Sequence, residues 1–158
     1  MDTRFELIPI GNVERPDPQF DAAELFDPSR ESVIAIDPDW GPALTGLEEY
    51  SHLIVLFWLD RAERPTEAPG LRPAESRAEL PPVGLFAIRT PRRPNPIGMC
   101  VVRLLRREGS RLHVTGLDAW NGTPVLDLKG YNRRDDMRPD ATHPDWLERL
   151  WAIHDAER

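Results

Sequence analysis

The sequence predicts a mainly β protein: an antiparallel sheet closed into a barrel or a sandwich, with one α-helix at the C-terminal end. Three observations support this prediction. Short apolar and β-branched runs recur along the chain, and 17 prolines and 10 glycines interrupt them within 158 residues. Helical spacing of apolar residues is clear only in residues 142–158. A mostly helical fold would be difficult to build around so many prolines.

The N-terminal part of the chain contains three predicted strands. Residues 5–13 open with alternating apolar residues and end in a turn, residues 32–38 are rich in β-branched side chains, and residues 51–60 are apolar on both faces. Residues 16–31 between them read as a loop with one helical turn around Ala22 to Phe26. Residues 42–50 read as another helical turn or irregular structure.

The second half begins with a proline-rich, charged loop over residues 61–82, and a loop of that length in a compact domain is functional or disordered. Four further strands are predicted, at residues 83–89, 97–106, 111–120 and 125–131. The final helix has cap candidates Thr142 and His143, Pro144 in its first turn, and an apolar stripe of Trp146, Leu147, Leu150 and Trp151.

Composition narrows the class of protein. No apolar run is long enough to span a membrane, and we expect a soluble cytoplasmic protein. The net charge of −7 argues against a wholly basic nucleic-acid-binding surface but allows a local basic patch. Cys100 is the one cysteine, so it forms no intramolecular disulfide, and its apolar neighbours favour a buried thiol over a nucleophile.

A stiff cationic bend separates two of the predicted strands, in the stretch "RTPRRPNPIGMC" at residues 89–100. Proline restricts the residue before it, so Arg93 and Asn95 are pushed towards extended conformations, and Gly98 permits close backbone approach. The bend is either a corner between strands or a ligand-binding element. The density of arginines, Arg89, Arg92 and Arg93, favours binding because a corner needs no charge.

A second bend, "WNGTPVLD" at residues 120–127, has a similar character. Asn121-Gly122 is a strong turn former, and Thr123 and Asp127 supply a hydroxyl and a carboxylate nearby. A hairpin turn with a polar rim and a binding site are both consistent with it. The chain lacks the GxSxG, P-loop, HExxH and GxGxxG patterns, and its cysteine and histidines show no metal-ligand spacing, so we expect no metal.

Four stretches occur together in the order typical of one known family: "IPIGNV", "GLEEYSHLIVLFWLD", "GLFAIRTPRRPNPIGMCVVRLL" and "LDAWNGTPVLDLKGY". Over residues 5–131 the chain resembles the TsaA-like (TrmO, YaeB) family. The resemblance implies a small antiparallel β-barrel and a homodimer whose cofactor pocket lies near the subunit interface. It implies an enzyme that uses S-adenosylmethionine to methylate N6 of threonylcarbamoyladenosine beside the tRNA anticodon. The acceptor could instead be a small molecule or another RNA, or the chain could be a non-catalytic binding module.

The resemblance also implies a set of cofactor-binding residues: Asp60, Arg61, Arg89, Met99, Asn121, Gly122, Thr123 and Pro124. The chain departs from the family pattern at Asn121, where members have aspartate, and at Gly130, where members have proline. It also lacks a Gln-Pro-Gly segment near the N-terminus. We expect residues 1–140 to form the barrel domain and residues 141–158 to form a helix on or beside it.

Methyl transfer from a sulfonium needs no metal, and positioning the acceptor can supply most of the catalysis. We assign Asp127 and Tyr131 as catalytic residues that orient the acceptor or take its proton. We assign Arg92, Arg93 and Asn95 to substrate binding, and Arg133, Arg134 and Arg138 are further candidates for tRNA phosphates. The two bends, near positions 94 and 122, are predicted to lie side by side as walls of one cleft.

Overall fold

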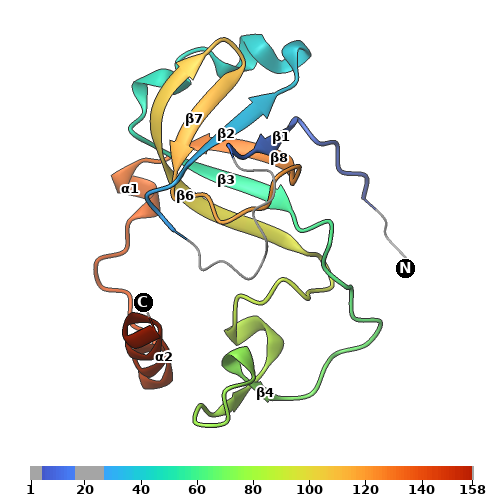
Figure 1. Ribbon diagram of the computed structural model, residues 1–158, viewed down its shortest axis with the longest axis vertical. Helices are drawn as coiled ribbons and strands as arrows, with labels where there is room; N and C mark the ends of the chain where they lie inside the picture. The colour runs from blue at the N-terminus through green and yellow to red at the C-terminus, as the bar shows by residue number, and fades with distance from the viewer. Residues whose placement is uncertain (1–4, 17–26, 158) are drawn as a thin grey trace.

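The computed structural model describes residues 5–16 and 27–157, and these form a closed barrel with a smaller unit below it (Figure 1). Within the described residues, six antiparallel strands close the barrel in the order β1–β2–β7–β6–β3–β8. The strands are β1 Gly11–Glu14, β2 Glu31–Ile36, β3 His52–Trp58, β6 Ile97–Glu108, β7 Arg111–Thr115 and β8 Pro124–Gly130. The predicted mainly β class and the barrel are therefore confirmed.

Strand β3 organises the barrel because it pairs along its whole length with β6 and over most of its length with β8. Successive side chains of a strand point to opposite faces, so Leu53, Val55 and Phe57 enter the barrel while their neighbours face out. Strand β2 shows the same alternation. The fully buried interior also contains Val13, Ile34, Val102, Leu112, Val114 and Val125.

The smaller unit joins the end of the chain to the segment between β3 and β6. Strands β4 Arg72–Pro73 and β5 Pro82–Val83 pair with each other, and helix α2 spans Asp145–Glu157. Leu150 of α2 packs with Ala74, Leu80 and Ile88 in an apolar cluster separate from the barrel core. We call residues 72–88 together with α2 the satellite unit.

The remaining described elements are short. Turns of 3₁₀ helix occur at Pro38–Leu44, Leu47–Glu49, Ala74–Ser76 and Leu85–Ala87, and helix α1 is Arg133–Asp136. Asn132 caps α1, since its side chain accepts a hydrogen bond from the backbone N–H of Asp135 at 2.9 Å. None of the helices in the described part of the chain is long and apolar enough to cross a membrane.

Most predicted strands are confirmed, at β2, β3, β6, β7 and β8, and the C-terminal helix is confirmed as α2. The predicted helical turn at residues 22–26 lies outside the described residues. The first strand is shorter than predicted: residues 5–10 are not in a strand, and Phe5, Leu7 and Ile8 are exposed.

The predicted strand at residues 83–89 is wrong. Only Val83 belongs to a strand, where it pairs with Arg72, and Leu85–Ala87 is 3₁₀ helix. Because β3 pairs directly with β6, the barrel closes without this segment, and Phe86 is left 79% exposed. The stripe on α2 is also narrower than predicted, since Leu150 is buried but Trp151 is 45% exposed and stacks beside His143.

Candidate functional site at the end of the barrel

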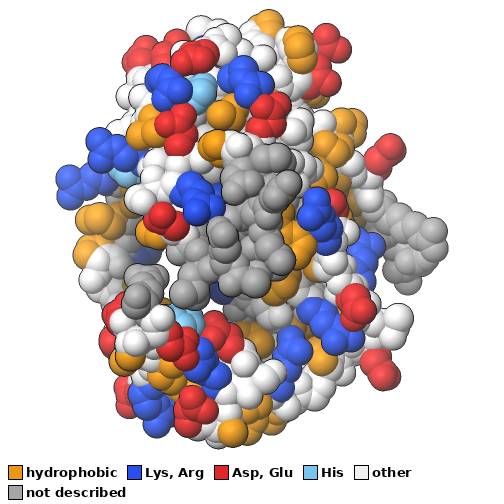
Figure 2. Space-filling view, viewed as in Figure 1, with side chains coloured by type: hydrophobic (Ala, Val, Ile, Leu, Met, Phe, Trp, Pro, Cys, Tyr) orange, Lys and Arg blue, Asp and Glu red, His pale blue; other side chains and the backbone are white. Residues whose placement is uncertain are grey.

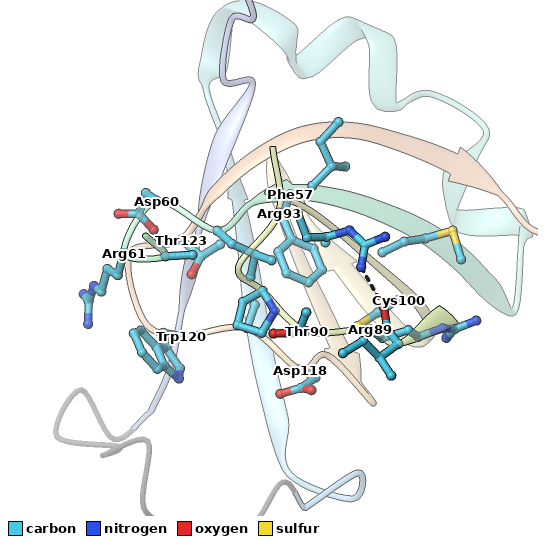
Figure 3. Close-up of a pocket in the computed structure, with 18 of the residues that line it drawn as sticks. Phe57, Asp60, Arg61, Arg89, Thr90, Arg93, Cys100, Asp118, Trp120 and Thr123 are labelled. Carbon is cyan, nitrogen blue, oxygen red and sulfur yellow. Dashed lines mark hydrogen bonds between the residues drawn. The ribbon is translucent and has the colours of Figure 1, made fainter. Parts of the chain in front are cut away.

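A pocket of about 700 Å³ lies where β3 ends and β6 begins (Figure 3). Four segments line it: residues 57–62, residues 86–93, residues 97–100, and the loop from β7 to β8 at residues 118–123. The first and third lie side by side because β3 pairs with β6. The other two segments each lead into one of the two bends identified from the sequence and include its first residues.

The two bends therefore contribute to one pocket within a single chain. Arg89, Thr90, Pro91 and Arg93 come from the first bend, and Trp120 and Thr123 come from the second. Gly122 adopts a left-handed conformation with φ +83° that favours glycine. Its N–H donates to the carbonyl oxygen of Val13 at 2.7 Å, which ties the second bend to β1.

Phe57 and Gly98 form the apolar floor of the pocket. They are register partners on β3 and β6, and the Phe57 ring is only 2% exposed. A Cβ atom on Gly98 would overlap that ring, so the absence of a side chain allows the ring to lie directly against the β6 backbone. The floor therefore depends on glycine at position 98.

Arginines join the rims of the pocket. Arg61 follows β3, donates a hydrogen bond to the carbonyl oxygen of Asn121 at 3.2 Å, and lies 5.3 Å from the ring centroid of Trp120. Arg93 donates to the carbonyl oxygen of Ile88 at 2.7 Å, shown as the dashed line in Figure 3, and lies 5.6 Å from the Phe86 ring. Each arginine is thus paired with an exposed aromatic face.

Sequence reasoning missed Asp118, whose carboxylate lies in the pocket. Asp118 is an exposed residue in the open pocket, but the protein atoms packed around its carboxylate raise its pKa, and the nearby Arg15 guanidinium opposes that shift. Burial also raises the pKa of the Cys100 thiol, with a hydrogen bond from the Asp118 backbone acting in the opposite direction. Cys100 lines the pocket as a protonated, half-buried thiol.

The structure brings six of the predicted site residues into the pocket wall: Asp60, Arg61, Arg89, Arg93, Met99 and Thr123. Asn121, Gly122 and Pro124 lie beside it in the second bend. The Asn121 side chain there accepts a hydrogen bond from the backbone N–H of Arg15 at 3.0 Å. Arg92 and Asn95 are exposed outside the wall, and Arg92 forms an ion pair with Glu63 at 3.4 Å.

The predicted catalytic residues Asp127 and Tyr131 do not line the pocket. Asp127 lies opposite Leu56 in the β3–β8 ladder and forms an ion pair with Lys129 at 2.6 Å. Tyr131 follows β8, where its N–H donates to the carbonyl oxygen of His52, and its ring lies 6.3 Å from the His52 ring. Their assignment to the acceptor stays a prediction.

Comparison with known proteins places this pocket in a family context. The chain is 32% identical to TrmO of P. aeruginosa, whose crystal structure superposes with a TM-score of 0.69 over 90% of this chain and 61% of that one. It is 50% identical over 105 residues to a "Probable S-adenosyl-L-methionine-binding protein" of Archaeoglobus fulgidus. It is 37% identical over 89 residues to a mouse "tRNA (adenine(37)-N6)-methyltransferase".

The shares of length differ among these relatives. The aligned region is 66% of this chain and 27% of the Archaeoglobus protein, and 56% of this chain and 20% of the mouse protein. The chain thus spans less than two thirds of each of these relatives.

The model of the "tRNA-methyltransferase O N-terminal domain" matches residues 22–137, which contain both bends and every segment of the pocket. This chain therefore belongs to the tRNA-methyltransferase O N-terminal domain family.

Proposed function

We propose that this protein transfers a methyl group from S-adenosylmethionine to N6 of threonylcarbamoyladenosine beside the anticodon of tRNA. The observation that carries the proposal is the pocket shared by the two bends, in a chain of this family. The name of the mouse relative supports the N6 acceptor in tRNA. The cytoplasm, where tRNA is modified, is the location that we propose.

The pocket residues fit S-adenosylmethionine in size and in chemistry. A volume of about 700 Å³ lies within the range of about 300–1,000 Å³ usual for small-molecule sites. Ile97 and Met99 are exposed apolar side chains of the pocket wall and can pack against a purine ring. Arg89 offers a guanidinium to a carboxylate, and Asp60 offers a carboxylate to an ammonium group.

The chain's own residues would act mainly by binding and positioning. When bound, S-adenosylmethionine supplies a methyl group attached to a positively charged sulfur. We assign Asp60, Arg61, Arg89, Met99 and Thr123 to holding it. We assign Asn121, Gly122 and Pro124 to shaping the rim above it. Electron-rich groups favour a cationic centre, and we assign that role to the Asp60 carboxylate in the pocket wall and to backbone carbonyl oxygens of the two bends.

The acceptor side of the site is suited to an unstacked base. Trp120 and Phe86 present exposed rings at the rim, and Arg61 and Arg93 lie over them. Single-stranded RNA is recognised by such aromatic and guanidinium planes together with phosphate contacts. We assign Arg92, Arg93 and Asn95 to the RNA. On the face shown in Figure 2, basic and acidic side chains are interleaved, so phosphate contacts would be local.

We also propose a homodimer formed through the outer face of β6. Ile97, Met99, Val101 and Leu105 alternate along that strand and are each at least 42% exposed. Such a row on a sheet face is typical of a protein interface. Ile97 and Met99 line the pocket as well, so a dimer formed here would place the two pockets near the interface.

Two measurements test the proposed function. Isothermal titration of the purified chain with S-adenosylmethionine should show saturable binding. Tritiated methyl groups should then enter tRNA from a strain that lacks this gene, and only when that tRNA carries threonylcarbamoyladenosine. Absence of binding overturns the cofactor assignment. Equal transfer to tRNA without the threonylcarbamoyl group overturns the acceptor assignment.

A second candidate is a protein that binds S-adenosylmethionine but methylates a small molecule or another RNA, or nothing. The observation in its favour is that the Archaeoglobus relative, at 50% identity, is named only as a binding protein. Saturable binding without transfer to any tRNA would support this candidate over the first.

A further inference from the structure

Asp118 is the pocket carboxylate that the proposed function leaves without a role. It follows Leu117 and precedes Ala119, which are 1% and 4% exposed, so the backbone is anchored on both sides while the residue between them faces the open pocket. Among the described residues, no hydrogen bond or salt bridge involves the Asp118 carboxylate. Its oxygens are therefore available to a bound molecule.

Arg15 fixes the backbone on both sides of Asp118. Its Nη2 donates to the carbonyl oxygen of Leu117 at 2.7 Å and to that of Ala119 at 2.6 Å, and its Nε donates to Ala119 at 2.9 Å. Arg15 is only 8% exposed, so these charge-assisted bonds are shielded from water. A buried arginine that binds the carbonyl groups before and after one residue restricts where that residue can point.

Arg15, which follows β1, is the charged group that acts directly on the Asp118 carboxylate. The Cys100 thiol on β6 receives a hydrogen bond from the Asp118 backbone, and Arg89 in the first bend acts on that thiol. Elsewhere in the same pocket are Asp60, Arg61 and Arg93. Asp60 and Asp118 lie on different sides of the pocket in Figure 3, with Asp60 beside Arg61. The two carboxylates are thus available to different parts of a bound complex.

We propose that Asp118 is the catalytic base, which accepts the proton from the acceptor nitrogen during methyl transfer, and that Arg15 is the residue that positions it. The proposal rests on the proposed function. It departs from the sequence-based assignment because Asp127 is paired with Lys129 outside the pocket wall, whereas Asp118 lies in the wall.

The nitrogen forms a bond to the methyl carbon while the bond between that carbon and sulfur breaks, and the electron pair of that bond stays on sulfur. The sulfonium becomes a neutral thioether. The proton of the acceptor N–H moves to a carboxylate oxygen of Asp118, so the methylated nitrogen leaves neutral. A carboxylate whose pKa is raised by burial is a better base for this transfer than an ordinary one.

The direct test compares Asp118→Asn with two matched substitutions. Asp118→Asn should lower the single-turnover rate of methyl transfer roughly 100-fold or more, the scale of general-base catalysis, while the Kd for S-adenosylmethionine changes less than about threefold. Asp39→Asn, at an exposed position on the first 3₁₀ helix, controls for loss of charge and should transfer at a rate near that of the wild type. Asp127→Asn separates the two assignments: if it loses the rate while Asp118→Asn keeps it, the sequence-based assignment holds and this inference is overturned.

The pH profile tests the base and its positioning separately. In the wild type, the rate should fall as pH drops through the raised pKa of Asp118, because only the carboxylate form accepts a proton. That acid limb should disappear in Asp118→Asn. In Arg15→Gln the limb should move to higher pH, since removal of a positive charge raises the pKa of Asp118 further. A merely structural role for Arg15 would lower stability and leave the limb unmoved.

Each outcome decides between the possibilities. A wild-type protein that binds no S-adenosylmethionine removes the proposed function, and this inference with it. If the wild type transfers methyl groups and Asp118→Asn does so equally fast, only this inference is overturned. A loss of cofactor affinity in Asp118→Asn that matches the loss of rate would make Asp118 a binding residue and would also overturn the inference.

Discussion

Gly98 shows how one missing side chain can shape a site. Its backbone lies against the ring of Phe57 on the paired strand, and this contact makes the floor of the pocket. The Phe57 ring is held in the barrel core, so it cannot withdraw into solvent to make room for a new group.

Gly98→Ala should therefore destabilise the barrel by about 1–3 kcal/mol, the usual cost of forcing an extra group into a packed core. It should also weaken binding of S-adenosylmethionine, because the displaced ring enters the pocket. Denaturant unfolding and titration calorimetry measure the two effects. Gly84→Ala is the matched control, since a Cβ at position 84 meets nothing within 4 Å and that glycine has an ordinary φ of −74°. Equal stability of the two variants would contradict the packing argument.

The site residues that could be predicted from the sequence are those fixed by their immediate neighbours in the chain. Proline and glycine fix the two bends without help from the rest of the fold, and the pocket lies between segments that flank them. Asp118 was missed because its place depends on Arg15, which binds the carbonyl oxygens of the residues on either side of it, 102 and 104 positions away in sequence. A pattern within one stretch contains no sign of such a partner.

At the scale of elements, α2 and residues 72–88 form a unit that the sequence did not reveal. Its apolar cluster is small and lies outside the barrel, and ion pairs cross between its two parts. Arg77 bonds to Glu157 at 2.8 Å, and Glu75 lies 3.0 Å from His154. A unit with so few buried side chains should open more readily than the barrel.

Leu150→Ala should release α2 from this unit. Loss of a buried leucine costs about 2–5 kcal/mol in a well-packed core, and the other α2 side chains on this cluster, Trp146 and Leu147, are only partly buried. Hydrogen exchange should speed up in residues 72–88 and in α2 while β3 and β6 stay protected. Arg149→Ala, on the exposed side of the helix, should leave exchange unchanged. Faster exchange throughout the barrel would contradict separate opening.

Protonation of Glu75 at low pH should make the satellite unit open more readily. Burial raises the pKa of Glu75, but hydrogen bonds from His154 and Arg77 outweigh that effect and hold the pKa below its usual value. A carboxylate with a lowered pKa stabilises the folded form above the ordinary glutamate pKa of about 4.3, and this contribution is lost as pH falls further. Exchange in α2 should therefore rise below that pH, and Glu75→Gln should remove most of the pH dependence. An unchanged acid response in that variant would contradict this origin.

The elements that sequence reasoning identified share one property. Strands β2 and β3 are apolar, β-branched runs of strand length, and helix α2 carries apolar residues at helical spacing. The stretch from Val83 to Arg89 is equally apolar, yet it is mostly 3₁₀ helix and extended chain. Pairing of β3 with β6 leaves no barrel edge for it, and pairing of that kind depends on the whole sheet.

At the scale of the whole molecule, the net charge of −7 contrasts with the arginines at the pocket rim. The exposed row on β6 is the other large-scale feature, and it is mainly apolar, with the exposed Arg103 between Val101 and Leu105. The two features lie next to each other because Ile97 and Met99 belong to both.

Val101→Glu should convert the proposed dimer to a monomer. Val101 is 48% exposed in the single chain and lies outside the pocket wall, so the charge would be tolerated by the fold but not by an interface. Light scattering after gel filtration measures the mass. The control is Leu71→Glu, which should leave the mass unchanged. Leu71 is 72% exposed and directly precedes the satellite unit. A wild-type protein that is already monomeric at high concentration would contradict the dimer.

Ile88 belongs both to the apolar cluster of the satellite unit and to the wall of the pocket. A ligand that contacts Ile88 in its packed position should bind less tightly when helix α2 is detached from residues 72–88. Coupling between two such events is mutual, so an occupied cavity would hold the helix in place to the same degree. Proteolytic cleavage of helix α2 should then become slower as the fraction of protein with an occupied pocket increases.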